Sequence, residues 1–295
     1  MTELKNRSEI LFLYDIKDTN PNGDPMDENK PRMDEETQTN IVTDVRLKRT
    51  VRDYLSAYKK QEIFVIEEAD KEGNQKTKDT RLKELKIDSP EKALELLDKY
   101  VDLRLFGATI AVKKASVTRT GPVQFRFGRS LHKVEPMLIQ GTTVMPSSEG
   151  KKQGTMTQVY VLPYSLIAFY GIVNENAGKS TRLKSEDIDL LMEGIWNGTK
   201  NLITRSKVGQ MPRLLLEVVY KEKNYHIGDL DKKIKLVADN ELAIRDVKDY
   251  KLDYTELLGA LKANKDKIEK IRYKADEKLK FSLDGIGVKT EEFKF

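Results

Sequence analysis

The sequence predicts a mixed α+β fold, and the order of its elements indicates a ferredoxin-like core of the βαββαβ type with large insertions. Two observations lead to this prediction. Short apolar runs typical of buried strands alternate with two segments of helical period, and a long charged segment interrupts them. A chain of 295 residues suits one domain with elaborations. Because this core supports many unrelated activities, the fold class alone indicates no function.

The expected core elements follow in the order strand, helix, strand, strand, helix, strand. The first strand, 9–16 (EILFLYDI), ends in a turn-rich run over 18–25, and the first helix spans 41–58 with one apolar face. The remaining core elements are strands over 122–127, 158–173 and 213–220, and a helix over 185–203 whose first turn carries acids that suit the helix dipole.

Three further segments are expected outside this core. Residues 60–102 read as an insertion, with one helix over 91–102 that Ser89 caps. Residues 140–157 have the composition of a projecting loop or hairpin. Residues 221–295 are weakly patterned, apart from a charged helix expected over 254–273.

The composition excludes several classes of protein. There is no cysteine and only His132 and His226 carry imidazole, so thiolate and zinc sites are not expected. No apolar run approaches about 18 residues, and the first residues do not resemble a signal peptide. Gly178 and Ser180 resemble the end of a phosphate-binding loop, but Val173 stands where that motif needs glycine. We therefore expect a cytoplasmic protein without a metal, a cofactor or a membrane partner.

The distribution of charge says more than the net charge of +5. Seven basic residues and no acid lie between Leu103 and Val134, and four bases without an acid lie between Glu193 and Glu217. The segment 61–102 has the opposite bias, with twelve acids and eight bases. A basic middle beside an acidic insertion indicates one surface for phosphates, although the folded chain could equally scatter these charges over several faces.

Ten side chains are candidates for binding phosphate or sugar: Arg46, Lys48, Arg49, Arg52, Arg119, Arg126, Arg129, Arg205, Lys207 and Gln210. Lys48 and Arg52 stand four residues apart along one edge of the first helix. Local pairs with Asp44 and Asp53 are an alternative explanation, but such pairs contribute only about 0.3–0.5 kcal/mol each. In the loop 205–210, Gly209 permits close approach of the backbone to a ligand. We expect reversal of both helix charges to abolish RNA binding and to leave the fold intact.

A catalytic alternative remains open on two features. The acids Asp15, Asp18, Asp24, Asp27 and Asp34 could hold magnesium for phosphodiester cleavage, although such loops use the same residues for tight turns. His132 could act as a general base in RNA cleavage, although a lone histidine more often has a structural role. The side chains of Phe125 and Phe127 are expected in the core, and not as stacking groups for bases.

Several long blocks resemble a known family. Residues 6–10 (NRSEI), 20–25 (NPNGDP), 29–34 (NKPRMD) and 41–50 (IVTDVRLKRT) closely resemble the N-terminal signature of backbone subunits of CRISPR Cascade complexes of types I-B and I-C. Further blocks at 102–108, 120–124 and 206–213 extend the resemblance over about residues 6–220. General likeness favours the I-B type within this RAMP superfamily.

The resemblance implies a hand-like subunit with a palm, helical fingers and a thumb. The palm would comprise about residues 6–59, 106–135 and 158–245, and the fingers about 60–105. The thumb would be a hairpin over about 136–157, and about 246–295 would form a C-terminal elaboration. Met145 and Met156 are the candidates for wedging bases from the thumb.

The resemblance also implies partners and a role. Such subunits polymerise along a guide RNA (crRNA), present it to target DNA, and assemble with other Cascade subunits and a recruited nuclease-helicase. They are not enzymes, whereas related subunits of type III complexes use a loop aspartate to cut RNA. A metal- or histidine-dependent endoribonuclease and a general single-strand binder are therefore the alternatives.

Overall fold

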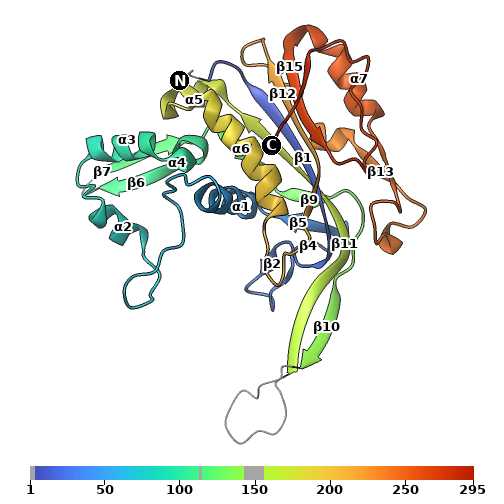
Figure 1. The fold of residues 1–295 in the computed structure, drawn as a ribbon, viewed down its shortest axis with the longest axis horizontal. Coiled ribbons are helices and arrows are strands. Elements are labelled where there is room, and N and C mark those ends of the chain that lie inside the picture. The colour runs from blue at the N-terminus through green and yellow to red at the C-terminus, as the bar shows by residue number, and fades with distance from the viewer. Residues whose placement is uncertain (1–3, 113–114, 143–155) are drawn as a thin grey trace, which may run out of the picture.

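The computed structural model describes residues 4–112, 115–142 and 156–295, and its centre is one large sheet (Figure 1). The strands of this sheet are β1 (Ser8–Thr19), β4 (Met33–Asp34), β5 (Thr39–Val42), β8 (Val123–Phe125), β9 (Gly128–Ser130), β10 (Met137–Thr142), β11 (Met156–Val173), β12 (Met211–Tyr220), β15 (Ile268–Ala275) and β16 (Thr290–Glu292). Their order is β16-β15-β12-β1-β11-β9-β5-β4, and β8 and β10 also pair with β11. The strands expected over 9–16, 158–173 and 213–220 are the three longest of this sheet.

The described residues also form seven α-helices, so the mixed α+β class is confirmed. These are α1 (Asp44–Ala57), α2 (Lys78–Glu84), α3 (Pro90–Lys99), α4 (Val101–Phe106), α5 (Glu175–Thr181), α6 (Ser185–Lys200) and α7 (Thr255–Ala263). Helix α1 begins three residues later than expected because Thr43 caps it and Thr39–Val42 forms β5. Among these helices, none is both long enough and apolar enough to cross a bilayer.

Four antiparallel strands at the middle of the sheet position the candidate site. They lie in the order β12-β1-β11-β9, so β1 is central and pairs with β11 and β12. Helix α1 follows β1, and α6 connects β11 to β12. Both helices pack on the same face of the sheet, where Phe12, Val51 and Trp196 belong to one apolar core (Figure 1).

Much of the segment 221–290 covers the opposite face of the sheet, which the weak sequence pattern did not predict, whereas β15 and β16 extend the sheet and Phe293 packs in the first core. A second apolar core lies on that opposite face. Helix α7, 3-10 turns and a short antiparallel pair of strands pack on it, and the pair consists of β13 (Lys235–Val237) and β14 (Lys251–Asp253). The charged helix expected over 254–273 ends at Ala263, and Ile268–Ala275 forms β15 instead. This part of the prediction is wrong because β15 takes its conformation from pairing with β12.

The insertion forms a small unit of its own beside α1. Helices α2, α3 and α4 pack against an antiparallel hairpin of β6 (Gly107–Val112) and β7 (Ala115–Thr120). A third apolar cluster, which contains Phe64, Leu97 and Ile110, joins these elements. Ser89 caps α3 as expected, since its side chain accepts the amide of Lys92.

A two-stranded ribbon extends from the far end of the sheet (Figure 1). β10 pairs here with the first residues of β11, and the side chains of Met137, Leu138 and Ile139 are all exposed. The loop that joins the two strands contains Met145 and lies outside the described residues. Two further short strands, β2 (Gly23–Asp24) and β3 (Lys30–Pro31), pair with each other in the turn-rich segment after β1.

Phe127 is not in the core, contrary to the expectation. Phe125 pairs with Gly171 and Arg129 pairs with Ala168. Between these two pairs the chain advances four residues from β8 to β9 but only three residues along β11. This register change is a β-bulge, and a bulge redirects the side chains that follow it. Phe125 is therefore buried as expected, whereas Phe127 has 56% of its surface exposed.

Candidate nucleic-acid interface

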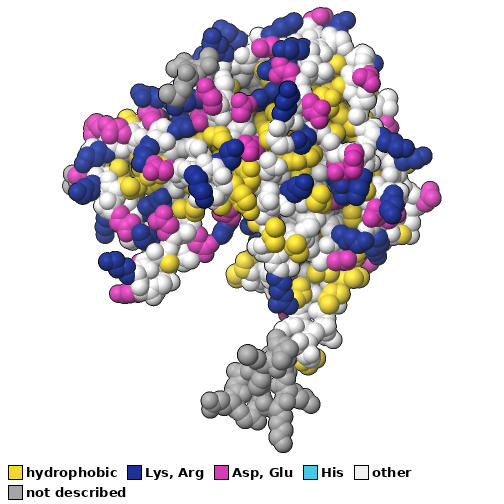
Figure 2. Space-filling model, viewed as in Figure 1, with side chains coloured by type: hydrophobic (Ala, Val, Ile, Leu, Met, Phe, Trp, Pro, Cys, Tyr) yellow, Lys and Arg dark blue, Asp and Glu magenta, His cyan; other side chains and the backbone are white. Residues whose placement is uncertain are grey.

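Six of the ten candidate phosphate-binding residues already pair with carboxylates of the same chain. Their partners are Asp44 for Lys48, Asp53 and Glu67 for Arg49, Asp102 for Arg52, Asp98 for Arg119, Asp229 and Asp231 for Arg126, and Asp34 for Arg129. Basic and acidic side chains also alternate over the face drawn in Figure 2. Of the ten, only Arg46, Arg205, Lys207 and Gln210 have no carboxylate partner within the described parts of the chain.

Lys48 and Arg52 lie together on one side of α1, as their spacing predicts, but they face the insertion. Each side chain is only 12% exposed, and both cations lie over the ring of Phe106 at 5.6 and 5.0 Å. The Nζ of Lys48 is 2.8 Å from Asp44, and the Nε of Arg52 is 3.1 Å from Asp102. In this conformation both side chains join α1 to the insertion. Their binding to RNA stays a prediction.

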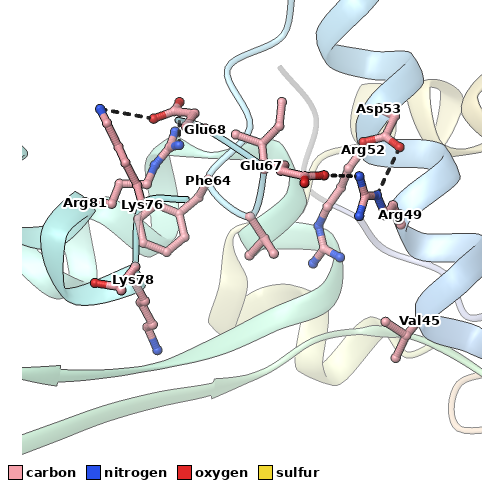
Figure 3. A pocket seen from close by; sticks show the side chains of 13 residues that line it. Val45, Arg49, Arg52, Asp53, Phe64, Glu67, Glu68, Lys76, Lys78 and Arg81 are labelled. Atoms are coloured by element: carbon pink, nitrogen blue, oxygen red, sulfur yellow. Dashed lines mark hydrogen bonds and ion pairs between the residues drawn. The ribbon is translucent and has the colours of Figure 1, made fainter. Parts of the chain in front are cut away.

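Arg49 lines a cleft of about 270 Å³ between α1 and the insertion (Figure 3). Its guanidinium group lies between Asp53 and Glu67, and across the cleft Glu68 pairs with Lys76 and Arg81. The cleft therefore carries both signs of charge in nearly matched pairs. Such a lining offers little net attraction to a phosphate chain.

The other four candidates lie near the end of β1, where three distant segments of the chain meet. Arg46 stands on the first turn of α1, and Lys207 and Gln210 stand on the loop before β12. The Nζ of Lys207 donates to the backbone oxygen of Asn20 at 2.8 Å, and the amide of Asn20 donates to the oxygen of Ser206 at 3.0 Å. We call Asn20, Arg46, Lys207 and Gln210 the Arg46–Lys207 cluster.

Two cations of this cluster are close to each other, and within the described residues neither forms an ion pair, although the charge of Asp53 also acts on Arg46. Burial, and then the charge of Arg46, lower the pKa of Lys207 to about 8. Burial also lowers the pKa of Arg46, whose Nη2 donates to the hydroxyl of Thr50 at 3.0 Å. Two like charges held in a partly desolvated place raise the free energy of the empty site. An anion between them would relieve that cost.

Three buried polar atoms of the cluster have no hydrogen-bond partner: Nε of Arg46, Nε2 of Gln210 and Oδ1 of Asn20. A buried donor without a partner costs about 1–3 kcal/mol, so these atoms are suited to a ligand. The two nitrogens are donors, which phosphate oxygens accept, and the Asn20 oxygen is an acceptor, which a ribose hydroxyl can satisfy. Arg205 is exposed on the same loop and adds a third cation.

His132 and most of the acids that were candidates for catalysis are bonded to other groups of the protein. His132 is 3% exposed; its Nδ1 is 2.9 Å from the oxygen of Lys133, and its Nε2 accepts the amide of Leu166 at 3.3 Å. Four of the five acids pair with a cation: Asp15 with Arg213, Asp24 with Arg32, Asp27 with Lys30, and Asp34 with Arg129. Neither ring nitrogen of His132 is free to take a proton from a substrate.

Comparison with known proteins identifies the family. Residues 6–255 match the family described as CRISPR-associated protein Cas7. A "CRISPR-associated protein Cas7" of Haloferax volcanii is 34% identical to this chain over 322 aligned positions, which cover 99% of the chain and 93% of the relative. The chain belongs to the Cas7 family.

Two solved structures share the fold of this Cas7 family member. A chain of a "CRISPR RNA-guided surveillance complex, pre-nicking" has a TM-score of 0.61 and 13% identity, with 97% of this chain and 96% of that chain covered. A chain of a "CRISPR RNA-guided surveillance complex" has a TM-score of 0.57 and 14% identity, with 98% and 95% covered. At these identities the likeness shows the fold alone.

Sequence reasoning missed one member of the cluster in this Cas7 family chain. Asn20 belongs to the block 20–25 (NPNGDP), which reads as a tight turn. The structure shows a second role, because its backbone oxygen holds Lys207 and its side-chain oxygen is unpaired. The signal available in the sequence was the repeat of asparagine at 20 and 22. The second asparagine also has a structural role, because Oδ1 of Asn22 accepts hydrogen bonds from the amide and the hydroxyl of Thr43 at 2.9 Å.

Proposed function

We propose that this chain is a non-catalytic subunit that binds a guide RNA (crRNA) and polymerises along it as the backbone of a Cascade complex. Membership of the Cas7 family supports this role. The observation that carries the proposal is the pair Arg46 and Lys207, two cations that are close to each other, partly desolvated and not ion-paired to an acid among the described residues. Such a site reads phosphate and sugar, so it leaves base edges free to pair with target DNA.

We further propose a ferredoxin-like palm. The strand order β12-β1-β11-β9, with α1 after β1 and α6 before β12, supports it, since this corresponds to the order 4-1-3-2 of that fold. We propose that the fingers extend beyond the expected boundary at about 105 to about 120, because the hairpin of β6 and β7 packs on the same apolar cluster as α3. Residues 136–157 would form the thumb, and 246–295 the C-terminal elaboration.

The partners follow from the same proposal. Exposed apolar side chains on the ribbon, among them Met137, Ile139 and Met156, favour contact with a partner such as the next copy, because a two-stranded ribbon is marginal alone in water. Met156 is 70% exposed and remains the candidate wedge. We also propose a type I-B assembly in the cytoplasm, with other Cascade subunits and a recruited nuclease-helicase.

Substitution of the two cations tests the binding site. Arg46→Gln combined with Lys207→Gln removes both charges and keeps polar, though shorter, side chains at both positions. We expect the affinity for single-stranded RNA, measured by fluorescence anisotropy, to fall about tenfold or more, because a hydrogen bond to a charged group contributes about 1.5–3 kcal/mol. The salt dependence of binding should also flatten by about 0.7 log units per log of salt for each phosphate that the variant no longer neutralises.

A matched control distinguishes a loss of affinity caused by the cluster from one caused by the lower net charge. Lys221→Gln combined with Lys223→Gln changes the net charge equally at two exposed residues that follow β12. This variant should bind RNA like the wild type. Equal losses in both variants would mean that binding follows net charge, and the cluster would then not be the site.

The non-catalytic role is tested on the same RNA. We expect the labelled RNA to remain intact when it is incubated with the protein and magnesium. Cleavage that disappears in Asp24→Ala or His132→Ala would instead establish the endoribonuclease alternative.

A further inference from the structure

The amino group of Lys207 bonds to a neutral partner. Its Nζ donates to the backbone oxygen of Asn20 at 2.8 Å, and it forms no ion pair within the described residues. A backbone carbonyl has no charge, so it stabilises an ammonium group less than a carboxylate does. By contrast, a hydrogen-bonded acid raises the pKa of Lys30 and that of Lys289.

The surroundings of this amino group favour its neutral form. Lys207 is half-buried, and burial and the charge of Arg46 lower its pKa to about 8. At pH 7.5 an amine with a pKa of about 8 is about one quarter unprotonated, whereas an ordinary lysine with a pKa of about 10.4 is about one thousandth unprotonated. The unprotonated amine is the nucleophile, and a lysine that is desolvated beside another cation is activated in this way.

An anion can be held directly beside this amine. Nε of Arg46 and Nε2 of Gln210 are buried donors without a hydrogen-bond partner, and Gln210 is itself only 5% exposed. Arg205 adds an exposed cation on the same loop. Such donors suit phosphate oxygens. A reagent that carries both a phosphate group and a reactive carbonyl would therefore be bound next to Lys207.

The loop that carries Lys207 is open on one side. Gly209 has a φ of +88°, and apart from its two neighbours in the chain no heavy atom lies within 4 Å of the place where its Cβ would stand. Val208 is 51% exposed. The bond to Asn20 uses one hydrogen of the amine, so the lone pair of the neutral form remains available for attack.

We propose that Lys207 is a modification site for acyl phosphates, in which Arg46 binds the phosphate group of the reagent and the neutral amine attacks its acyl carbon. The N–C bond forms as the C–O bond to the phosphate breaks, and inorganic phosphate leaves with the proton that the amine releases. The product is an amide without a charge. Its consequence rests on the proposed RNA-binding function: acylation removes one of the two cations of the site, and bound RNA shields the amine.

Acetylation of the RNA-free protein tests the proposal. Acetyl phosphate is the probe, and peptide mass spectrometry measures the initial rate at each lysine at pH 7.5. The exposed residues Lys221 and Lys223 are the references within the same chain. We expect Lys207 to react about tenfold faster than either reference, because far more of its amine is unprotonated. Inorganic phosphate should slow the reaction at Lys207 and leave the references unchanged.

A neutral ester separates the reactivity of the amine from binding of the anion. p-Nitrophenyl acetate carries no phosphate, so Lys207 should remain the fastest of the three lysines, and inorganic phosphate should not slow it. In Arg46→Gln, the ratio of the rate with acetyl phosphate to the rate with the ester should fall at Lys207 and stay constant at Lys221. Because both rates are measured at the same amine, this ratio is independent of any change in its pKa.

Equal rates at the three lysines would overturn the proposal, as would a rate at Lys207 with acetyl phosphate that inorganic phosphate does not change. Neither result involves RNA, so the RNA-binding function would stand. Bound single-stranded RNA should slow acetylation of Lys207 at least about fivefold and leave Lys221 unchanged. Fast, phosphate-sensitive acetylation without protection by RNA would establish the modification site and show that the RNA binds elsewhere.

Discussion

The Nε of Arg52 lies 3.1 Å from Oδ2 of Asp102, a carboxylate with no exposed surface. The same carboxylate accepts the backbone amides of Phe64 and Val65 at 3.0 Å, where the chain enters the insertion. One buried acid on α4 thus connects α1 with the start of the insertion and with α4. The pair fixes the orientation of this unit against the central sheet.

Arg52→Ala should destabilise the protein by about 3–5 kcal/mol, because it leaves a buried carboxylate without its cation. The free energy of unfolding from urea titration measures the effect. Arg49→Ala is the matched control on the same helix, and loss of its exposed pairs should cost only about 0.2–1 kcal/mol. Similar free energies for both variants would contradict the structural role of Arg52.

This pair also changes the expected outcome of reversing the charges of Lys48 and Arg52. The sequence suggested that such a variant keeps its fold. The burial of both side chains against Phe106 indicates that two new acids beside Asp44 and Asp102 would detach the insertion from α1. Loss of RNA in that variant would therefore not by itself identify a phosphate contact.

RNA affinity should fall as the pH rises from 7 to 9. Burial and Arg46 lower the pKa of Lys207 to about 8, so the free protein loses this proton within that range. A bound phosphate favours the ammonium form, so binding above pH 8 requires uptake of a proton and weakens by up to about tenfold per pH unit. Anisotropy titrations at constant ionic strength measure this slope.

Lys207→Arg provides the control, since a guanidinium group stays charged over the whole range. Its RNA affinity should change less between pH 7 and 9 than that of the wild type. The same pH slope in both proteins would show that another group titrates, and Lys207 would not be the proton acceptor.

Acid should destabilise the protein through His132. Burial lowers the pKa of this imidazole below its usual 6.5, so the unfolded chain binds the proton first as the pH falls. The stability that the neutral ring provides is complete above pH 6.5 and declines below it. Unfolding free energies at pH 7.5 and 5.5 should differ more in the wild type than in His132→Gln. His226→Gln, at an exposed position, should keep the pH dependence of the wild type.

The elements that were predictable from the sequence are those with local signals. Ser89 is a capping residue in both the prediction and the structure, and the apolar run 9–16 is the central strand. The bulge before Phe127 was not predictable, because it depends on the register with β11, about forty residues away. Alternation along 122–127 assumes an unbroken strand, and one extra residue reverses it.

In the candidate site, too, local signals were predictable and contacts between distant segments were not. Charge and spacing singled out the right residue types, but partners from distant segments decide which cations remain available. Asp102 and Phe106, about fifty residues after Arg52, enclose that side chain. Lys207 meets Arg46 only because the loop before β12 lies against the end of β1. No local pattern separates an enclosed arginine from an available one.

Glu9 explains how residues 221–295 are held on the sheet. This acid is fully buried in β1 and accepts the hydroxyls of Tyr170 and Tyr220. It also accepts the backbone amides of Ile227 and Gly228 at 2.9 and 2.8 Å, just after β12. Four donors therefore depend on one acidic side chain, at the first residue of the predicted strand 9–16.

Glu9→Ala should reduce the free energy of unfolding by at least about 3 kcal/mol, because each buried donor without an acceptor costs about 1–3 kcal/mol. Tyr170→Phe is the control, since it removes one donor and leaves the acid with the other three. Hydrogen exchange gives the specific readout: the amides of Ile227 and Gly228 should lose protection in Glu9→Ala and keep it in Tyr170→Phe. Unchanged protection in Glu9→Ala would show that apolar packing alone holds this layer, and that the buried acid has another purpose.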